Sequence, residues 1–151
     1  MSQRLRSMPR LAAWKKSKGQ AAENSRPASW PSILVTRASI PLLKASRGLV
    51  VNLASIAGEV PTPGLSIYGA AKAAVIHFTR SLNAELEGDG VRATALCPGF
   101  VDTPMVSWTG LASEQMIQPE DCAEIVRLLL RLTPAARIPQ VVVERLGSGS
   151  A

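Results

Sequence analysis

Tyr68 and Lys72 are the two residues whose types and spacing point most directly to chemistry. A helix places residues four positions apart on one face, one turn from each other. There the Lys72 ammonium would favour the phenolate of Tyr68 and lower the pKa of the phenol, which is about 10 in an isolated tyrosine. A more acidic phenol can exchange a proton with a carbonyl or alcohol oxygen near neutral pH. The pair therefore indicates carbonyl reduction, or alcohol oxidation in reverse.

Three further elements make this pair more specific. A Tyr followed four residues later by Lys occurs often by chance and is weak evidence alone. In this sequence Ser55 precedes the pair, and Pro98-Gly99 followed by Thr103 comes after it. The elements in this order indicate one shared site far more strongly than any of them separately.

Alternating helices and strands are predicted to position these residues. Apolar residues at helical spacing predict helices over 33–46, 67–86 and 119–132, and short apolar runs predict buried strands over 49–53, 91–96 and 140–143. Pro41 is expected to bend or end the first helix, and Ser66 is a candidate cap of the second. Residues 103–118 are expected to form a longer loop. The alternation predicts βαβ units and a parallel sheet.

The carboxyl edge of that sheet is the expected location of the site. Ser55 follows the first strand and Pro98-Gly99 follows the second, while the helix with Tyr68 and Lys72 starts at the same edge. Open α/β sheets bind ligands in the crevice outside this edge.

Three segments carry a family resemblance: Val50 to Gly58, Tyr68 to Ala74, and Cys97 to Met105. They resemble the second half of a short-chain dehydrogenase/reductase, and the likeness runs from about residue 33 to about residue 147. The resemblance implies an α/β fold, a partial Rossmann-like doubly wound parallel sheet of about three strands with flanking helices. This fold would be incomplete in its N-terminal half.

The resemblance also implies an activity and the residues that perform it. The chain would be an NAD(P)-dependent oxidoreductase that interconverts a carbonyl and a secondary alcohol by hydride transfer. Tyr68 would be the general acid/base, Lys72 would lower its pKa and bind the nicotinamide ribose, and Ser55 would hydrogen-bond the substrate oxygen. The substrate would be a small-molecule ketone or alcohol.

The same resemblance assigns cofactor-binding residues and a lid. Tyr68, Lys72, Pro98, Gly99, Val101 and Thr103 would contact NAD or NADP on its nicotinamide side. Met105, Trp108 and Leu111 would either form part of an apolar lid over the substrate or simply pack the loop. No residue is assigned to a metal.

The sequence departs from the family in its first part. No glycine-rich phosphate-binding turn occurs, and the residue that selects NAD or NADP is missing. Ala28 stands where the family has a catalytic Asn. We therefore expect a truncated family member that is inactive by itself. The alternative is a non-catalytic fragment that associates with a full-length family member through helices 33–46 and 67–86, and a homo-oligomer is a further expectation.

Composition and charge limit the number of domains, the compartment and the partners that we expect. A chain of 151 residues is one domain at most, and its two cysteines, without metal-ligand spacing or disulfide density, favour a reducing, cytoplasmic location. Six of the basic residues precede the first acid, Glu23, and the rest of the chain is nearly neutral. We therefore expect neither a nucleic-acid nor a membrane partner. The basic start leaves two other interpretations, an organelle address and a disordered arm that binds nucleic acid or an anionic membrane.

The domain organisation follows from the same patterns. Residues 1–31 are predicted to be a basic, disordered leader, residues 32–147 the partial dehydrogenase domain, and residues 148–151 a flexible tail.

Overall fold

The computed structural model describes residues 29–148 of the chain. Its helices are α2 (Trp30–Ser46), α3 (Ser66–Glu85) and α4 (Pro119–Arg131), and its strands are β1 (Leu49–Leu53), β2 (Arg92–Pro98) and β3 (Gln140–Val143). Four short 3₁₀ helices join them: η2 (Ile56–Gly58), η3 (Glu87–Asp89), η4 (Pro104–Thr109) and η5 (Ser113–Gln115). Nearly all of the predicted leader, Ala28 included, and most of the predicted tail lie outside the described residues.

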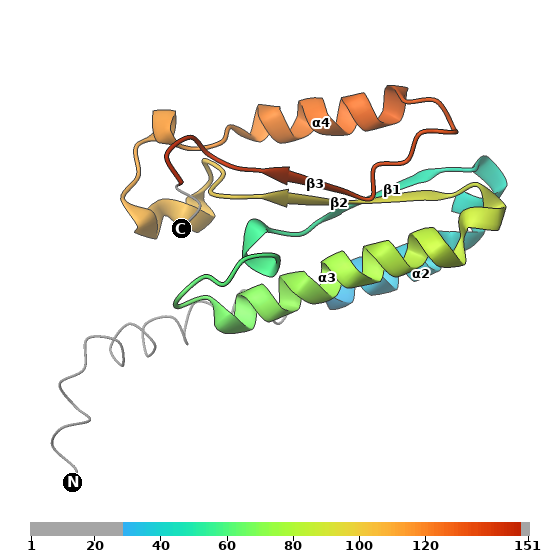
Figure 1. The fold of residues 1–151 in the computed structure, drawn as a ribbon, viewed down its shortest axis with the longest axis horizontal. Coiled ribbons are helices and arrows are strands. Elements are labelled where there is room, and N and C mark those ends of the chain that lie inside the picture. The colour runs from blue at the N-terminus through green and yellow to red at the C-terminus, as the bar shows by residue number, and fades with distance from the viewer. Residues whose placement is uncertain (1–28, 149–151) are drawn as a thin grey trace, which may run out of the picture.

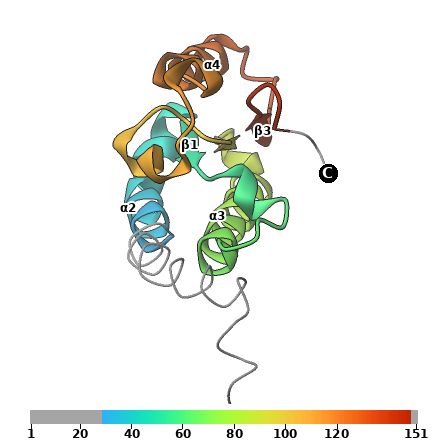
Figure 2. The same cartoon turned by 90° about the vertical axis from the view of Figure 1, so that its left-hand side faces the viewer.

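The three strands form one parallel sheet in the order β1-β2-β3. Leu49 pairs with Arg92, and Ala95 pairs with Gln140. Helices α2 and α3 cover one face of the sheet and α4 covers the other (Figures 1 and 2). The predicted α/β class with a partial, parallel Rossmann-like sheet is confirmed.

The core lies mainly between β2 and α3 and is built from small and medium apolar side chains. Two clusters make it up: Ala54, Val75, Ile76, Ala95 and Cys97, and Leu82, Leu86, Val91 and Ala93. Burying a Val or Leu side chain fully contributes about 1.5–3 kcal/mol, so α3 is held to the sheet chiefly by these contacts.

Buried amide side chains add polar links between α3 and the sheet. Asn83 accepts a hydrogen bond from the Ala93 N–H at 2.9 Å and donates one to the Ala93 carbonyl at 2.7 Å. On the neighbouring strand, Asn52 donates to the Thr79 hydroxyl at 2.9 Å. These bonds fix how far along the sheet α3 lies, and thereby where its first turns meet the carboxyl edge.

The helices differ from the sequence-based expectations at Pro41 and at Ser66, while α2 ends at Ser46 as predicted. Helix α2 continues through Pro41, which is exposed, so water can hydrogen-bond the carbonyl that the proline leaves unpaired. The helix ends at Ser46, and Arg47 takes the left-handed conformation with φ 49°. Ser66 is the first residue of α3 rather than its cap, because Leu65 occupies the cap position without a side-chain hydrogen bond.

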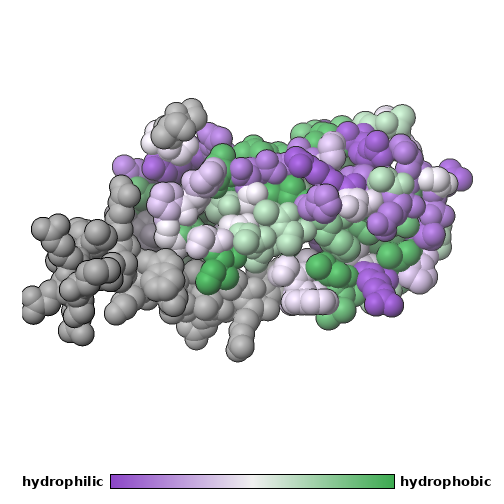
Figure 3. All heavy atoms as spheres, turned by 60° about the horizontal axis from the view of Figure 1, so that its bottom comes forward, coloured by the Kyte–Doolittle hydropathy of each residue, from purple (hydrophilic) through white to green (hydrophobic). Residues whose placement is uncertain are grey.

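Strand β1 is an edge strand within the described part of the chain, since β2 is its one partner there. Its last residue, Leu53, is 57% exposed. Helix α2 also exposes large apolar side chains: Trp30, Leu34, Val35 and Leu42. On the face formed by α2 and α3, hydrophobic side chains are interspersed among hydrophilic ones (Figure 3). No helix in residues 29–148 combines the length and apolar character that a membrane crossing requires.

Candidate active site

Ser55, Tyr68 and Lys72 come together at the carboxyl edge of the sheet. Ser55 lies two residues after the end of β1, and Tyr68 and Lys72 occupy the first two turns of α3. The extended strand followed by η2 turns the chain so that Ser55 faces the start of α3. The sequence-based placement of these three residues at one edge thus agrees with the structure.

Ser55 is held by backbone groups on both sides. Its backbone is extended, with φ −167° and ψ 154°, and its side chain is the N-cap of η2. Its hydroxyl accepts a hydrogen bond from the Ala57 N–H at 3.2 Å and lies 3.5 Å from the Pro98 carbonyl, to which it donates. Only 8% of the residue is exposed. The hydroxyl is therefore fixed where β1 and β2 both end.

Tyr68 is half-buried, and its environment keeps the phenol protonated. Burial raises the pKa of Tyr68 above its ordinary value of 10.0, while a hydrogen-bonding interaction with Ser55 acts in the opposite direction. The sequence suggested instead a pKa lowered by Lys72. That expectation is wrong in direction for this structure, because loss of solvent around the phenol outweighs the favourable interactions with the phenolate.

Lys72 is 9% exposed, and its ammonium contacts both the end of β1 and the ring of Tyr68. The nitrogen donates a 2.9 Å hydrogen bond to the Leu53 carbonyl and lies 5.7 Å from the centre of the Tyr68 ring. That separation is within the range of cation–π attraction. Burial lowers the pKa of Lys72, and the charge of the nearby Cys97 thiolate would act in the opposite direction.

The residues predicted to contact the cofactor differ in how they relate to this group. Pro98 ends β2, and its carbonyl meets the Ser55 hydroxyl. Gly99 donates its N–H to the Val143 carbonyl at 2.8 Å, which continues the pairing with β3. Val101 forms a parallel bridge with Ile117. The Thr103 hydroxyl donates to the Val101 carbonyl at 3.3 Å, within its own segment. Pro98 is thus joined directly to the Ser55 group, while Val101 and Thr103 lie farther along the same edge.

The segment after Thr103 forms the short helices η4 and η5 rather than an irregular loop. The Trp108 ring meets Phe100 edge-on, with ring centres 5.9 Å apart and planes at 90°. Met105 is exposed, and Leu111 is half-buried. Ser113 hydrogen-bonds the Asp102 carboxylate, which ties η5 back to the end of β2. Trp108 therefore packs against its own segment while Met105 faces solvent.

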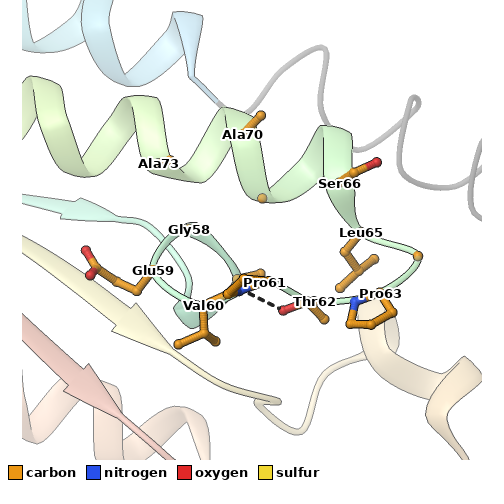
Figure 4. A pocket seen from close by; sticks show the side chains of 13 residues that line it. Gly58, Glu59, Val60, Pro61, Thr62, Pro63, Leu65, Ser66, Ala70 and Ala73 are labelled. Atoms are coloured by element: carbon orange, nitrogen blue, oxygen red, sulfur yellow. Dashed lines mark hydrogen bonds between the residues drawn. The ribbon is translucent and has the colours of Figure 1, made fainter.

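A pocket of about 440 Å³ lies beside the Ser55 group but does not include it. Residues 57–66 form one wall, and the small side chains Ala70 and Ala73 of α3 form the other (Figure 4). Its lining is largely apolar, with Pro61 and Pro63 on the loop side. None of the three candidate catalytic residues lines it, so it is a feature of the loop rather than the reaction site.

Two contributors to the site escaped the sequence analysis. The Leu53 carbonyl anchors Lys72, and a backbone group leaves no signal in residue types. Cys97 is buried near Lys72, where its thiolate would raise the pKa of the ammonium if it formed. Burial, followed by the charge of Glu59, raises the pKa of the Cys97 thiol to about 11, so it is neutral at physiological pH.

Comparison with known proteins places this geometry among dehydrogenases. A family model described as short chain dehydrogenase matches residues 29–112. An uncharacterised oxidoreductase of Staphylococcus epidermidis is 37% identical over 110 residues, which cover 72% of this chain and 48% of that protein. The 2-(R)-hydroxypropyl-CoM dehydrogenase of Xanthobacter autotrophicus is 39% identical over 105 residues, covering 69% of this chain and 36% of that protein. The chain spans about half the length, or less, of these curated relatives.

Solved structures show the same similarity in three dimensions. A β-ketoacyl-[ACP] reductase from Bacteroides thetaiotaomicron superposes with a TM-score of 0.66 at 30% identity, over 83% of this chain and 54% of that one. A serine dehydrogenase complexed with NADP+ superposes with a TM-score of 0.66 at 28% identity. The match covers 74% of this chain and 50% of that one. A 3-oxoacyl-[acyl-carrier protein] reductase from Brucella melitensis with bound NAD superposes with a TM-score of 0.59 at 30% identity. The match covers 75% of this chain and 45% of that one.

Proposed function

From the premise that this chain belongs to the short-chain dehydrogenase/reductase family, we propose that it carries the proton-transfer residues of a nicotinamide-dependent oxidoreductase that interconverts a carbonyl and a secondary alcohol. The observation that supports this most is the meeting of Ser55, Tyr68 and Lys72 at the carboxyl edge of a parallel sheet. A proton donor, a cation and a hydrogen-bonding hydroxyl are the groups that reduction of a polar double bond requires.

Tyr68 is the proposed proton donor. The phenol is protonated at neutral pH, so it carries the proton that the reduction consumes; burial raises its pKa, and the groups beside it must offset this when the proton leaves. When hydride adds to the carbonyl carbon, the electron pair of the C=O double bond moves to oxygen, which takes the phenol proton. Tyr68 is left as a phenolate, and the reverse reaction returns the proton to it.

Lys72 and Ser55 are the proposed supporting groups. The positive charge of Lys72, 5.7 Å from the centre of the Tyr68 ring, stabilises the phenolate as it forms. The Ser55 hydroxyl, which donates to the Pro98 carbonyl at 3.5 Å in this structure, would turn its single O–H to the substrate oxygen and orient that oxygen toward Tyr68.

The residues present fit the nicotinamide-ribose end of NAD or NADP. An ammonium has three N–H donors, and within residues 29–148 Lys72 uses one of them, on the Leu53 carbonyl. The other two would be available to bind a ribose hydroxyl. The bound nicotinamide would supply the hydride. The sequence offers no glycine-rich turn for the pyrophosphate, so we assign residues to the nicotinamide side alone: Tyr68, Lys72, Pro98, Gly99, Val101 and Thr103.

Fluorescence titration with NADH and with NADPH tests the proposal. We expect saturable binding that Lys72→Met weakens about tenfold, the equivalent of about 1.4 kcal/mol for a lost charged hydrogen bond. Lys44→Met is the matched control, because Lys44 is exposed and pairs with Asp89 away from the site. Binding weaker than about 1 mM for both nucleotides would contradict an autonomous enzyme. The tighter of the two identifies the nucleotide that the protein uses.

A second candidate function rests on the apolar residues that α2 exposes. Trp30, Val35 and Leu42 have more than half of their surface exposed, which favours a partner that covers them. We propose as the alternative that the chain associates, without catalysis, with a full-length family member through α2 and α3. Light scattering of the mixture should show a complex that Val35→Glu with Leu42→Glu abolishes. A strictly monomeric chain in the mixture would contradict it.

A further inference from the structure

Helix α3 and the short helix η2 touch through two glycines. A Cβ atom added to Gly69 would lie 2.6 Å from the carbonyl oxygen of Ala57. One added to Gly58 would lie 2.7 Å from the backbone nitrogen of Ala73 and 2.8 Å from the carbonyl carbon of Lys72. Carbon atoms in normal contact are about 3.5–4.0 Å apart. Because the atoms met are backbone, a side chain at either position would force the two segments apart.

The contact lies between the two segments that carry the candidate catalytic residues. Ser55 is the N-cap of η2, bonded to the Ala57 N–H. Gly69 follows Tyr68 directly and meets the carbonyl of that same Ala57. Gly58, at the other end of η2, lies beside α3 close to Ala73 (Figure 4). Each glycine is thus adjacent to a site residue and faces the opposite segment.

We propose that Gly58 and Gly69 are positioning residues whose missing Cβ atoms set the separation between the Ser55 hydroxyl and the Tyr68 phenol. The catalytic meaning of this role rests on the proposed function. The separation of the two side chains itself does not depend on cofactor or substrate, so its effect can be measured in their absence.

A small movement is enough to disturb this pair. Hydrogen bonds between oxygen atoms span about 2.5–3.0 Å and weaken steeply beyond that range. A Cβ at Gly69, 2.6 Å from the Ala57 carbonyl oxygen, would have to move away from it by about 1 Å to reach ordinary contact. That shift carries the Ser55 cap away from α3 and weakens the interaction by which Ser55 lowers the pKa of the phenol.

The pKa of Tyr68 is a direct measure of this interaction, because Tyr68 is the single tyrosine of the chain. The pKa of Tyr68 can be read from the ultraviolet absorbance of tyrosinate as pH rises. Ser55→Ala defines the effect of losing the Ser55 interaction, which raises the pKa. Gly69→Ala and Gly58→Ala are the test variants. Gly88→Ala is the matched control, since a Cβ there meets nothing within 4 Å.

We expect both test variants to raise the pKa of Tyr68 in the same direction as Ser55→Ala, and the control to leave it unchanged. In the Ser55→Ala background, Gly69→Ala should add little, because the interaction it disrupts is already gone. Equal shifts in both backgrounds, or no shift in the folded test variants, would overturn the proposal. Loss of cooperative unfolding in both test variants would also overturn it, since the contact would then serve the whole fold. None of these readings uses nucleotide, so failure to bind NADH or NADPH would count against the proposed function alone.

Discussion

Lys72 donates a 2.9 Å hydrogen bond to the carbonyl oxygen of Leu53, the last residue of β1. This bond joins the second turn of α3 to the strand that leads into Ser55. It holds a nearly buried cation at the sheet edge, where its charge is available to Tyr68. The strand end that exposes Leu53 to solvent thus also supplies the backbone group that fixes Lys72.

The burial of Lys72 should make stability depend on pH. Its pKa is lowered in the folded chain, so just below the ordinary value of 10.5 the unfolded state binds more protons. The free energy of unfolding should therefore rise as pH increases toward 10.5. Lys72→Met should remove this rise and Lys44→Met should keep it, as measured by urea unfolding across the pH range. A rise of the same size in Lys72→Met would show that another group causes it.

The Tyr68 phenol should lose its proton at a higher pH in the folded protein than in the unfolded protein. Burial raises its pKa above 10.0, whereas in denaturant the tyrosine should return to about 10. Between these values the unfolded state has lost the proton and the folded state retains it, so stability should fall as pH rises above about 10. Tyrosinate absorbance gives the two midpoints, and Tyr68→Phe should abolish that part of the fall. A native midpoint at or below the denatured one would contradict this prediction.

Asn83 should be one of the most sensitive polar positions of the fold. Its two shortest side-chain hydrogen bonds go to the backbone of Ala93 in the central strand, and a longer one of 3.5 Å goes to the Thr79 carbonyl. Asn83→Ala would leave a buried N–H and a buried carbonyl without partners, at a cost of about 2–4 kcal/mol. Glu85→Ala, exposed on the same helix, should change stability by less than about 0.5 kcal/mol. Urea unfolding measures both, and equal effects would show that the Asn83 bonds contribute little.

The two cysteines should react at very different rates. Burial raises the pKa of Cys97 to about 11, and the residue is fully buried, so roughly one thiol in a thousand is ionised at pH 8. Cys122 is half-exposed on α4. Mass spectrometry after iodoacetamide treatment should show one label on the native protein, at Cys122, and two after unfolding. Rapid double labelling of the native chain would mean that β2 opens readily.

The strands were the most predictable part of the fold. Residues 49–53 and 140–143 were predicted with the bounds the structure has, because each is a short apolar run that begins next to Gly48 or Pro139. Helix ends were less predictable. Pro41 is tolerated because it lies on the exposed side of α2, and a sequence pattern that ignores the position of solvent cannot show this.

For the candidate site, residue types and order sufficed to bring Ser55, Tyr68 and Lys72 to one edge. Their electrostatics did not follow, because the direction of the Tyr68 pKa depends on how much solvent surrounds the phenol. The close contact of Gly58 with α3 was missed as well. A glycine in a loop usually indicates a turn, and only coordinates show that a backbone lies where its Cβ would be.

The strand order also determines how the chain can fold. Leu49 pairs with Arg92 and Ala95 pairs with Gln140, so each pairing must close a long loop before it gains any hydrogen bond. Helices such as α3 form within about a microsecond, whereas non-local pairings are slow. We therefore expect the rate-limiting step to be the docking of β2, with α3 already formed, between its two neighbours. During synthesis, one edge of β2 would remain unpaired until β3 leaves the ribosome.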